Sequence, residues 1–162
     1  MSITTDMVQG WRQPQKVMQR HLARGRSEPF AFSLLVTFLV LVFVSLWPQL
    51  SRQSLIQPEV PMVQRLVAAG LALLASVPVW YGVAALSHWI AKLFGGHGSH
   101  YRARLALFAA LVCVSPAMLL QGLVAGMIGT GPQLSLVQGL VGLGFLWIWI
   151  SMVRVAERDN AD

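Results

Sequence analysis

Four long runs of apolar residues dominate this chain of 162 residues. A helix that crosses the hydrocarbon core of a bilayer needs about 20 predominantly apolar residues, each adding about 1.5 Å. The runs that approach or exceed this length are residues 31–47, 66–94, 105–128 and 134–153. They predict an all-α, polytopic membrane protein with four transmembrane helices, preceded by an N-terminal amphipathic helix at the membrane interface.

The composition excludes the soluble alternative. Charged residues make up 11% of the chain and hydrophobic residues 56%, whereas an ordinary soluble domain carries about 25% charged residues. A soluble domain of this length would not have enough polar groups to cover its surface. Lipid is therefore the expected solvent for most of the chain.

Proline and glycine define the expected ends and bends of the spans. Pro48 is expected to end the first span, because proline cannot continue the helical hydrogen-bond ladder. The second span would be roughly 43 Å long if straight, which exceeds the bilayer core, and Pro78 offers a kink. Pro116 lies near the middle of the third span, and Gly131 and Pro132 are expected to form the turn before the fourth.

The basic residues predict an orientation. Ten of the twelve Lys and Arg residues fall on one side of the four spans, and only Arg52 and Arg65 fall on the other. By the positive-inside rule, both termini are then cytoplasmic, and we expect a multi-pass protein of the bacterial inner (cytoplasmic) membrane. The charge is thus an orientation signal, and we expect no nucleic-acid partner. The predicted organisation is a cytoplasmic tail (1–28), a membrane domain (29–154) and a short cytoplasmic tail (155–162).

The N-terminal tail contains a segment, residues 5–24, with helical periodicity. Apolar and basic residues recur there on different faces of a helix. The residues expected at the membrane surface are Trp11, Arg12, Lys16, Arg20 and Arg24. We expect Pro14 to start its regular part and Gly25 to end it, with Trp11 at headgroup level and the basic face toward anionic lipid headgroups. The alternative is a docking surface for a cytoplasmic partner.

Catalytic and metal-binding patterns are absent from the sequence. No Asp or Glu lies within the four runs, which disfavours proton-coupled or sodium-coupled transport. No nucleophile elbow, zinc-protease pair or P-loop is present, so we expect neither catalysis nor a cofactor. His97 and His100 have a ligand-like spacing but form an incomplete metal site, and His88 is expected to be an interfacial histidine.

Polar and small residues within the spans have two interpretations. Pro78 and Pro116 each free a carbonyl four residues earlier. Together with Gln121 and Gln138, they would either line a narrow polar path or bond between helices and fix the bundle, which is the interpretation that we favour. Gly122 and Gly126 form a G-x-x-x-G pattern that allows close helix packing, within one chain or between chains.

The order of these features resembles that of a known family. A helix opened by Pro14 is followed by a long span that ends in Ser87-His88 and Gly95-Gly96. Next come the basic segment Tyr101-Arg102-Ala103-Arg104 and a span broken at Pro116. A last span with Trp147-Ile-Trp149 closes in Ala156-Glu157.

From about Pro14 to Glu157, this pattern is similar to the bacterial branch of the Yip (Ypt-interacting protein) family. Its members are polytopic membrane proteins, and the eukaryotic ones bind Rab-type GTPases and act in vesicle traffic. Those members have an Asp-Leu-Tyr-Gly-Pro-like motif and five spans. This chain lacks that motif and has four runs, so no GTPase-contacting residue is carried over. The resemblance implies a non-enzymatic protein of the inner membrane.

Two functions remain as hypotheses. The first is a scaffold, assembly factor or accessory subunit that acts by protein or lipid contacts, with a membrane-protein partner or a second copy of the chain. The alternative is a passive pore or carrier for a small solute. An enzyme that acts on lipid through His88, His97 and His100 ranks behind both.

Overall fold

The computed structural model describes residues 3–158, and all its regular secondary structure over that range is helical. The helices are α1 (Ile3–Arg12), α2 (Pro14–Leu22), α3 (Glu28–Ile56), α4 (Met62–Ala75), α5 (Val77–Leu93), α6 (His100–Met127) and α7 (Pro132–Arg158). Four helical units are long and apolar enough to cross a membrane, namely α3, α4 with α5, α6 and α7. The all-α, four-span prediction is confirmed.

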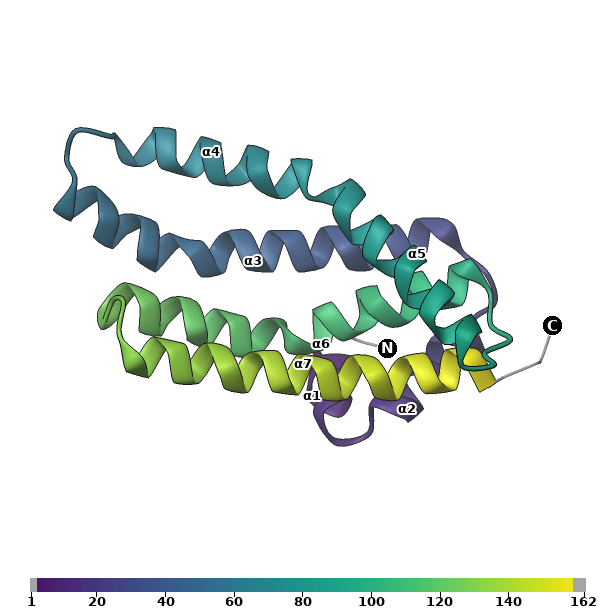
Figure 1. Cartoon of the computed structure of the whole chain (residues 1–162). Coiled ribbons are helices and arrows are strands. Elements are labelled where there is room, and N and C mark those ends of the chain that lie inside the picture. Colours follow the sequence, from purple (N-terminus) through teal and green to yellow (C-terminus); the bar gives the residue numbers. More distant parts are fainter. Residues whose placement is uncertain (1–2, 159–162) are drawn as a thin grey trace.

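The spans form a row and not a closed ring (Figure 1). Helix α3 packs between α4 and α6, and α6 packs between α3 and α7, while α5 crosses α6 at one end. That end holds the last turn of α5, the first turn of α6 and the last turn of α7, and we call it the basic end. The opposite end holds the α3–α4 and α6–α7 connections.

The first span does not end at Pro48 as predicted. Helix α3 continues through Pro48 to Ile56. Pro48 packs against Gly126 of α6, and Arg52, one turn later, donates hydrogen bonds to the carbonyls of Gly126 (3.4 Å) and Met127 (3.0 Å). These contacts hold α3 on α6 beyond the proline, so tertiary packing outweighs the lost helical hydrogen bond.

The second span is interrupted next to Pro78. Ser76 separates α4 from α5, and the ribbon changes direction there (Figure 1). The Ser76 hydroxyl donates to the Leu73 carbonyl at 2.6 Å, which satisfies an acceptor beside the break. The bend directs α5 away from α4 and across α6.

The protein core surrounds one half of α6. Every residue from Leu105 to Ser115 is buried, although the helix has no single apolar face. Helices α3, α5 and α7 and the N-terminal segment together enclose this half, whereas the half beyond Pro116 is only partly covered. The turn before α7 spans residues 128–131, and Pro132 is the first residue of α7, where a missing N–H costs nothing.

The N-terminal segment is two helices where one was expected. The backbone leaves the helical region at Gln13 (φ −142°), and Pro14 then starts α2, as predicted. Both helices pack on the bundle, α1 mainly against α6 and α2 mainly against α7. Val17 and Met18 of α2 are completely buried. We call α1 and α2 the N-terminal hairpin.

Candidate functional site

The N-terminal hairpin is fixed to the middle of α6 by Trp11. Its indole Nε1 donates to the Cys113 carbonyl at 2.9 Å, and Gly10 packs directly on the Cys113 side chain. Cys113 lies thirteen residues into α6, about 20 Å from the start of that helix. Trp11 therefore contacts the bundle far from the ends of the spans. The sequence pattern had instead predicted a position for Trp11 at headgroup level.

This bond lies in the turn of α6 that precedes Pro116. A proline inside a helix clashes with the carbonyl four residues earlier and disturbs the turn before it. The Cys113 carbonyl belongs to that turn, and Trp11 is the donor that reaches it. The Ser115 hydroxyl donates within the same turn, to the Leu111 carbonyl at 2.9 Å.

Charged side chains tie α1 to α2 inside the hairpin. Arg20 Nη2 lies 3.4 Å from Asp6 Oδ1 and also donates to the Gln9 side chain. His21 Nε2 lies 3.5 Å from Asp6 Oδ2. Burial of the His21 ring lowers its pKa below the ordinary value of 6.5, although Asp6 acts in the opposite direction.

The outward surface of the hairpin keeps the rest of the expected basic face. Arg12, Lys16 and Arg24 are exposed, and the Arg24 guanidinium lies 5.1 Å from the centre of the Phe30 ring. Arg20, by contrast, is engaged within the hairpin. The face available to lipid headgroups or a partner is therefore smaller than the sequence pattern indicated.

A buried contact between a histidine and a carboxylate, which the sequence did not predict, lies at the basic end. His88 Nδ1 of α5 is 3.1 Å from Glu157 Oε1 of α7. The other carboxylate oxygen, Oε2, accepts from the Gly98 N–H at 2.8 Å. His88 is 1% exposed and Glu157 8%, and the His100 ring packs edge-on against His88 with 4.3 Å between ring centres.

Two glycines let the α5–α6 loop close over Glu157. A Cβ on Gly96 would lie 2.6 Å from Glu157 Oε2, and a Cβ on Gly98 would lie 2.8 Å from it. The loop also donates from the His97 N–H to the Glu157 carbonyl at 3.3 Å. The motifs Ser87-His88, Gly95-Gly96 and Ala156-Glu157 thus meet at one place. In the sequence, these three motifs are grouped only by the resemblance to a known family.

A groove runs between α5 and α7 beside the His88–Glu157 contact. Its volume is about 720 Å³. Its walls are mainly apolar, with Ile90 and Phe94 on α5 and Trp149 and Ile150 on α7. Arg154 and Arg158 lie at its end.

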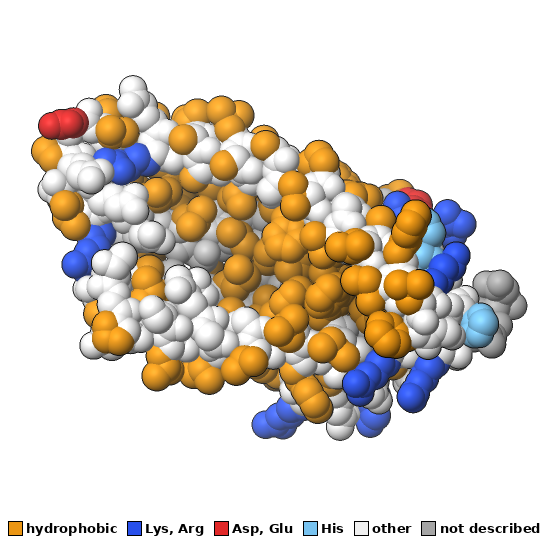
Figure 2. Space-filling view, in the orientation of Figure 1, with side chains coloured by type: hydrophobic (Ala, Val, Ile, Leu, Met, Phe, Trp, Pro, Cys, Tyr) orange, Lys and Arg blue, Asp and Glu red, His pale blue; other side chains and the backbone are white. Residues whose placement is uncertain are grey.

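A second cavity, of about 490 Å³, opens sideways between α4 and α7, toward the opposite end. Figure 2 shows it as a hollow lined with hydrophobic side chains between the upper part of the molecule, which holds α4, and the lower part, which holds α7. Gln121 of α6 and Gln138 of α7 both line it, so the structure brings these two predicted residues together. Within the described residues, neither amide has a hydrogen-bond partner. We call this space the lateral cavity.

The remaining predicted residues lie elsewhere. Gly122 and Gly126 face α3, where the Ser45 carbonyl and the Pro48 ring occupy the space that a side chain would need. The G-x-x-x-G pattern is therefore used within the chain. Pro78 is exposed at the start of α5. Over residues 3–158, no group of three or more His, Cys, Asp or Glu side chains is placed to hold a metal ion.

Comparison with known proteins gives one match. The family model described as the Yip1 domain matches residues 9–157, which include α2, all four spans and Glu157. No curated protein and no solved structure matches the chain.

Proposed function

The chain belongs to the Yip1 domain family, and from this premise we propose that it is a membrane scaffold, an assembly factor or accessory subunit that binds a partner and catalyses no reaction. The family is not known as enzymatic. The observation that carries the proposal is the lateral cavity, in which Gln121 and Gln138 present amides that have no partner among the described residues.

The cavity has the chemistry of a helix-binding surface. An amide that faces hydrocarbon without a partner is costly, and a hydrogen bond between transmembrane helices recovers about 0.6–2 kcal/mol. Gly142 lines the same cavity, and a Cβ there would meet nothing within 4 Å. A partner helix can therefore bring its backbone close to α7. We propose that this helix belongs to a membrane-protein partner or to a second copy of the chain.

The same cavity bears on the alternative function, a passive pore or carrier. A pore needs walls on all sides and a path between both ends of the bundle. The lateral cavity opens sideways, and toward the basic end its lining includes the large rings of Phe38, Trp80 and Phe145. Beyond them, α6 is buried from Leu105 to Ser115. This geometry supports binding at the side of the protein more than passage through it.

We also propose a location and an orientation. The basic end and the N-terminal hairpin carry ten of the twelve Lys and Arg residues, and the opposite end carries Arg52 and Arg65. By the positive-inside rule, the basic end faces the cytoplasm of a bacterial inner membrane. We propose that the exposed residues Lys16 and Arg24 then meet anionic headgroups of the inner leaflet.

Site-directed crosslinking in native membranes tests the scaffold. The one native cysteine, Cys113, is 1% exposed, so a benzophenone maleimide would label a new cysteine selectively. We expect Gln138→Cys to give a protein adduct of defined size. The matched control is Leu136→Cys, exposed on the same helix and turned by about 200°, which should give lipid adducts only.

Two results would count against the scaffold. One is an identical adduct pattern from Gln138→Cys and Leu136→Cys. The other is flux of small neutral solutes through reconstituted protein that Gln121→Leu or Gln138→Leu abolishes while the fold is retained, which would favour the pore.

A further inference from the structure

We propose that the groove between α5 and α7 binds one anionic phospholipid. An acyl chain lies along the apolar walls, and the phosphate lies against Arg154 and Arg158. This site is separate from the lateral cavity. It does not depend on the scaffold function, since either one can fail while the other holds.

The lining of the groove changes from apolar to basic along α7. It runs from Trp149 to Arg158, nine residues or about 14 Å. Its apolar part ends at Val153, about 6 Å from Trp149, and Arg154 and Arg158 follow. The groove therefore offers an apolar wall to the part of an acyl chain nearest its headgroup, and the arginines lie at the end where the headgroup would be.

The size and lining of the groove suit a lipid chain. The groove holds about 720 Å³, which lies within the range of small-molecule sites. Ile90, Phe94 and Ile150 line this space and are at least 47% exposed, so an acyl chain would cover apolar surface that the protein leaves open.

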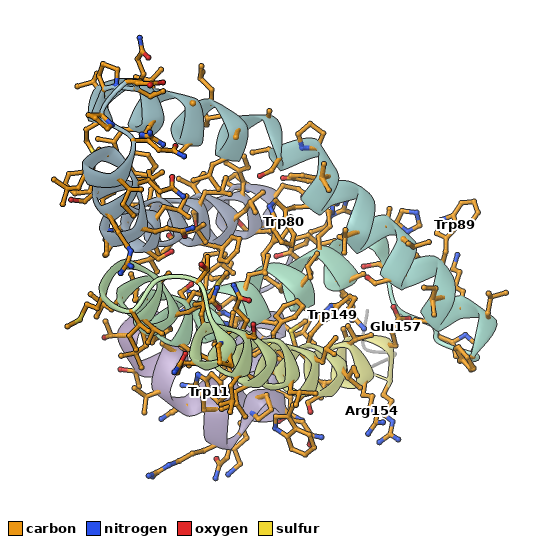
Figure 3. The ribbon with its side chains drawn as sticks, turned by 60° about the vertical axis from the view of Figure 1, so that its left-hand side comes forward. Trp11, Trp80, Trp89, Trp149, Arg154 and Glu157 are labelled. Atoms are coloured by element: carbon orange, nitrogen blue, oxygen red, sulfur yellow. The ribbon has the colours of Figure 1, made fainter. Side chains whose placement is uncertain are left out.

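The charge at the end of the groove selects an anionic headgroup. Arg154 and Arg158 are one helical turn apart on α7, both are exposed, and neither has a carboxylate partner within residues 3–158. Glu157 also lines the groove, but His88 and the Gly98 N–H already engage its two oxygens. Figure 3 shows Arg154 reaching outward from the end of α7. Among residues 3–158, the accessible charge at this point is therefore positive.

Amide donors extend the same site toward α2. Gln15 and Gln19 line a smaller space of about 180 Å³ together with Arg154 and Arg158. A phosphate at the two arginines would lie within reach of these donors, which suits the several oxygens of a phosphodiester and its glycerol. The N-terminal hairpin thus completes the headgroup side of the site.

Photocrosslinking tests the proposal on the full chain. The protein is reconstituted in phosphatidylcholine vesicles that contain a minor fraction of phosphatidylglycerol with a diazirine on one acyl chain. We expect adducts concentrated on the α5 and α7 residues of the groove, at several times their level on the exposed face of α4. Neutralising Arg154 or Arg158 to Gln should lower the groove adducts about fivefold, and neutralising both about thirtyfold.

Control variants distinguish lipid binding in the groove from a general electrostatic attraction of the anionic lipid to the basic surface of the protein. The pair Arg12→Gln and Lys16→Gln removes equal charge from the hairpin and should leave the groove adducts unchanged. Ala91→Phe, which narrows the groove and keeps both arginines, should lower them. The proposal is overturned if adducts spread evenly over the exposed helices, if the double arginine variant labels like the wild type, or if excess inorganic phosphate displaces the lipid.

Discussion

His88 and Glu157 are 69 residues apart in the sequence, yet His88 Nδ1 lies 3.1 Å from Glu157 Oε1 in a buried contact between α5 and α7. The contact joins the end of the broken second span to the end of the fourth. It also holds the α5–α6 loop, because the second carboxylate oxygen accepts from Gly98. One carboxylate therefore fixes the relative position of three segments at the basic end, beside both the groove and the start of α6.

We expect Glu157→Ala to destabilise the protein strongly. The variant leaves His88 Nδ1 and the Gly98 N–H without their partner at a buried position, and each buried polar group left unpaired costs about 1–3 kcal/mol. Glu157→Gln keeps an acceptor for Gly98 and should cost about 1–3 kcal/mol. The free energy of unfolding can be measured by SDS titration in mixed micelles, followed by helical circular dichroism.

Arg158→Gln is the matched control, since it changes a charge on the same turn at an exposed side chain. It should alter the free energy of unfolding by less than about 0.5 kcal/mol. Equal effects of Glu157→Ala and Arg158→Gln would contradict a structural role for the His88–Glu157 contact.

The close approach of α6 to α3 gives a second prediction. A Cβ at Gly122 would overlap the Ser45 carbonyl, so Gly122→Ala must separate the helices and should cost about 1–3 kcal/mol. Gly139→Ala adds the same methyl group to α7 in open space and should be neutral or stabilising by up to about 1 kcal/mol. Mixed-micelle unfolding of the two variants compares them directly, and a neutral Gly122→Ala would disprove the tight contact.

The spans were predictable because they depend on local composition, whereas their ends were not. The length of the second run and Pro78 were enough to predict the break near Ser76. Pro48 misled the prediction because α3 continues past it through contacts with α6. Pro48 packs on Gly126, and Arg52 of α3 donates to the Met127 carbonyl at the end of α6. A proline ends a helix only where no such contacts continue it.

The site was predictable only in part, for a similar reason. Gln121 and Gln138 stand out in apolar runs, so the sequence singled them out, but their common cavity depends on how α6 and α7 pack. Glu157 lies just beyond the last apolar run, where a charged side chain is normally solvated. Its burial requires His88 and Gly98 from segments about 60–70 residues earlier, and no periodicity in one sequence records that contact.

The hydrogen bond between Trp11 and Cys113 gives a third prediction. Trp11→Phe removes the donor, at a cost of about 1 kcal/mol, and also the outer edge of the indole that packs against Gly144. Opening of the N-terminal hairpin should then rise at least about fivefold, measured as faster amide exchange in α1 and α2. Trp89→Phe, at a ring that is 68% exposed, should leave this exchange unchanged; an equal rise in both variants would mean that the bond does not hold the hairpin.

Protonation of His21 should release the same hairpin at acid pH. Because burial holds the pKa of docked His21 below 6.5, the undocked hairpin takes up the proton first as the pH falls. Docking should therefore be complete above about pH 6.5 and weaken as the pH falls from there toward the lowered pKa. Amide exchange in α1 and α2 should be faster at about pH 5.5 than at about pH 7.5 after correction for the intrinsic exchange rate. His21→Leu should remove this difference, whereas His97→Leu, at an exposed loop position, should retain it; a pH dependence that survives His21→Leu would assign it to another group.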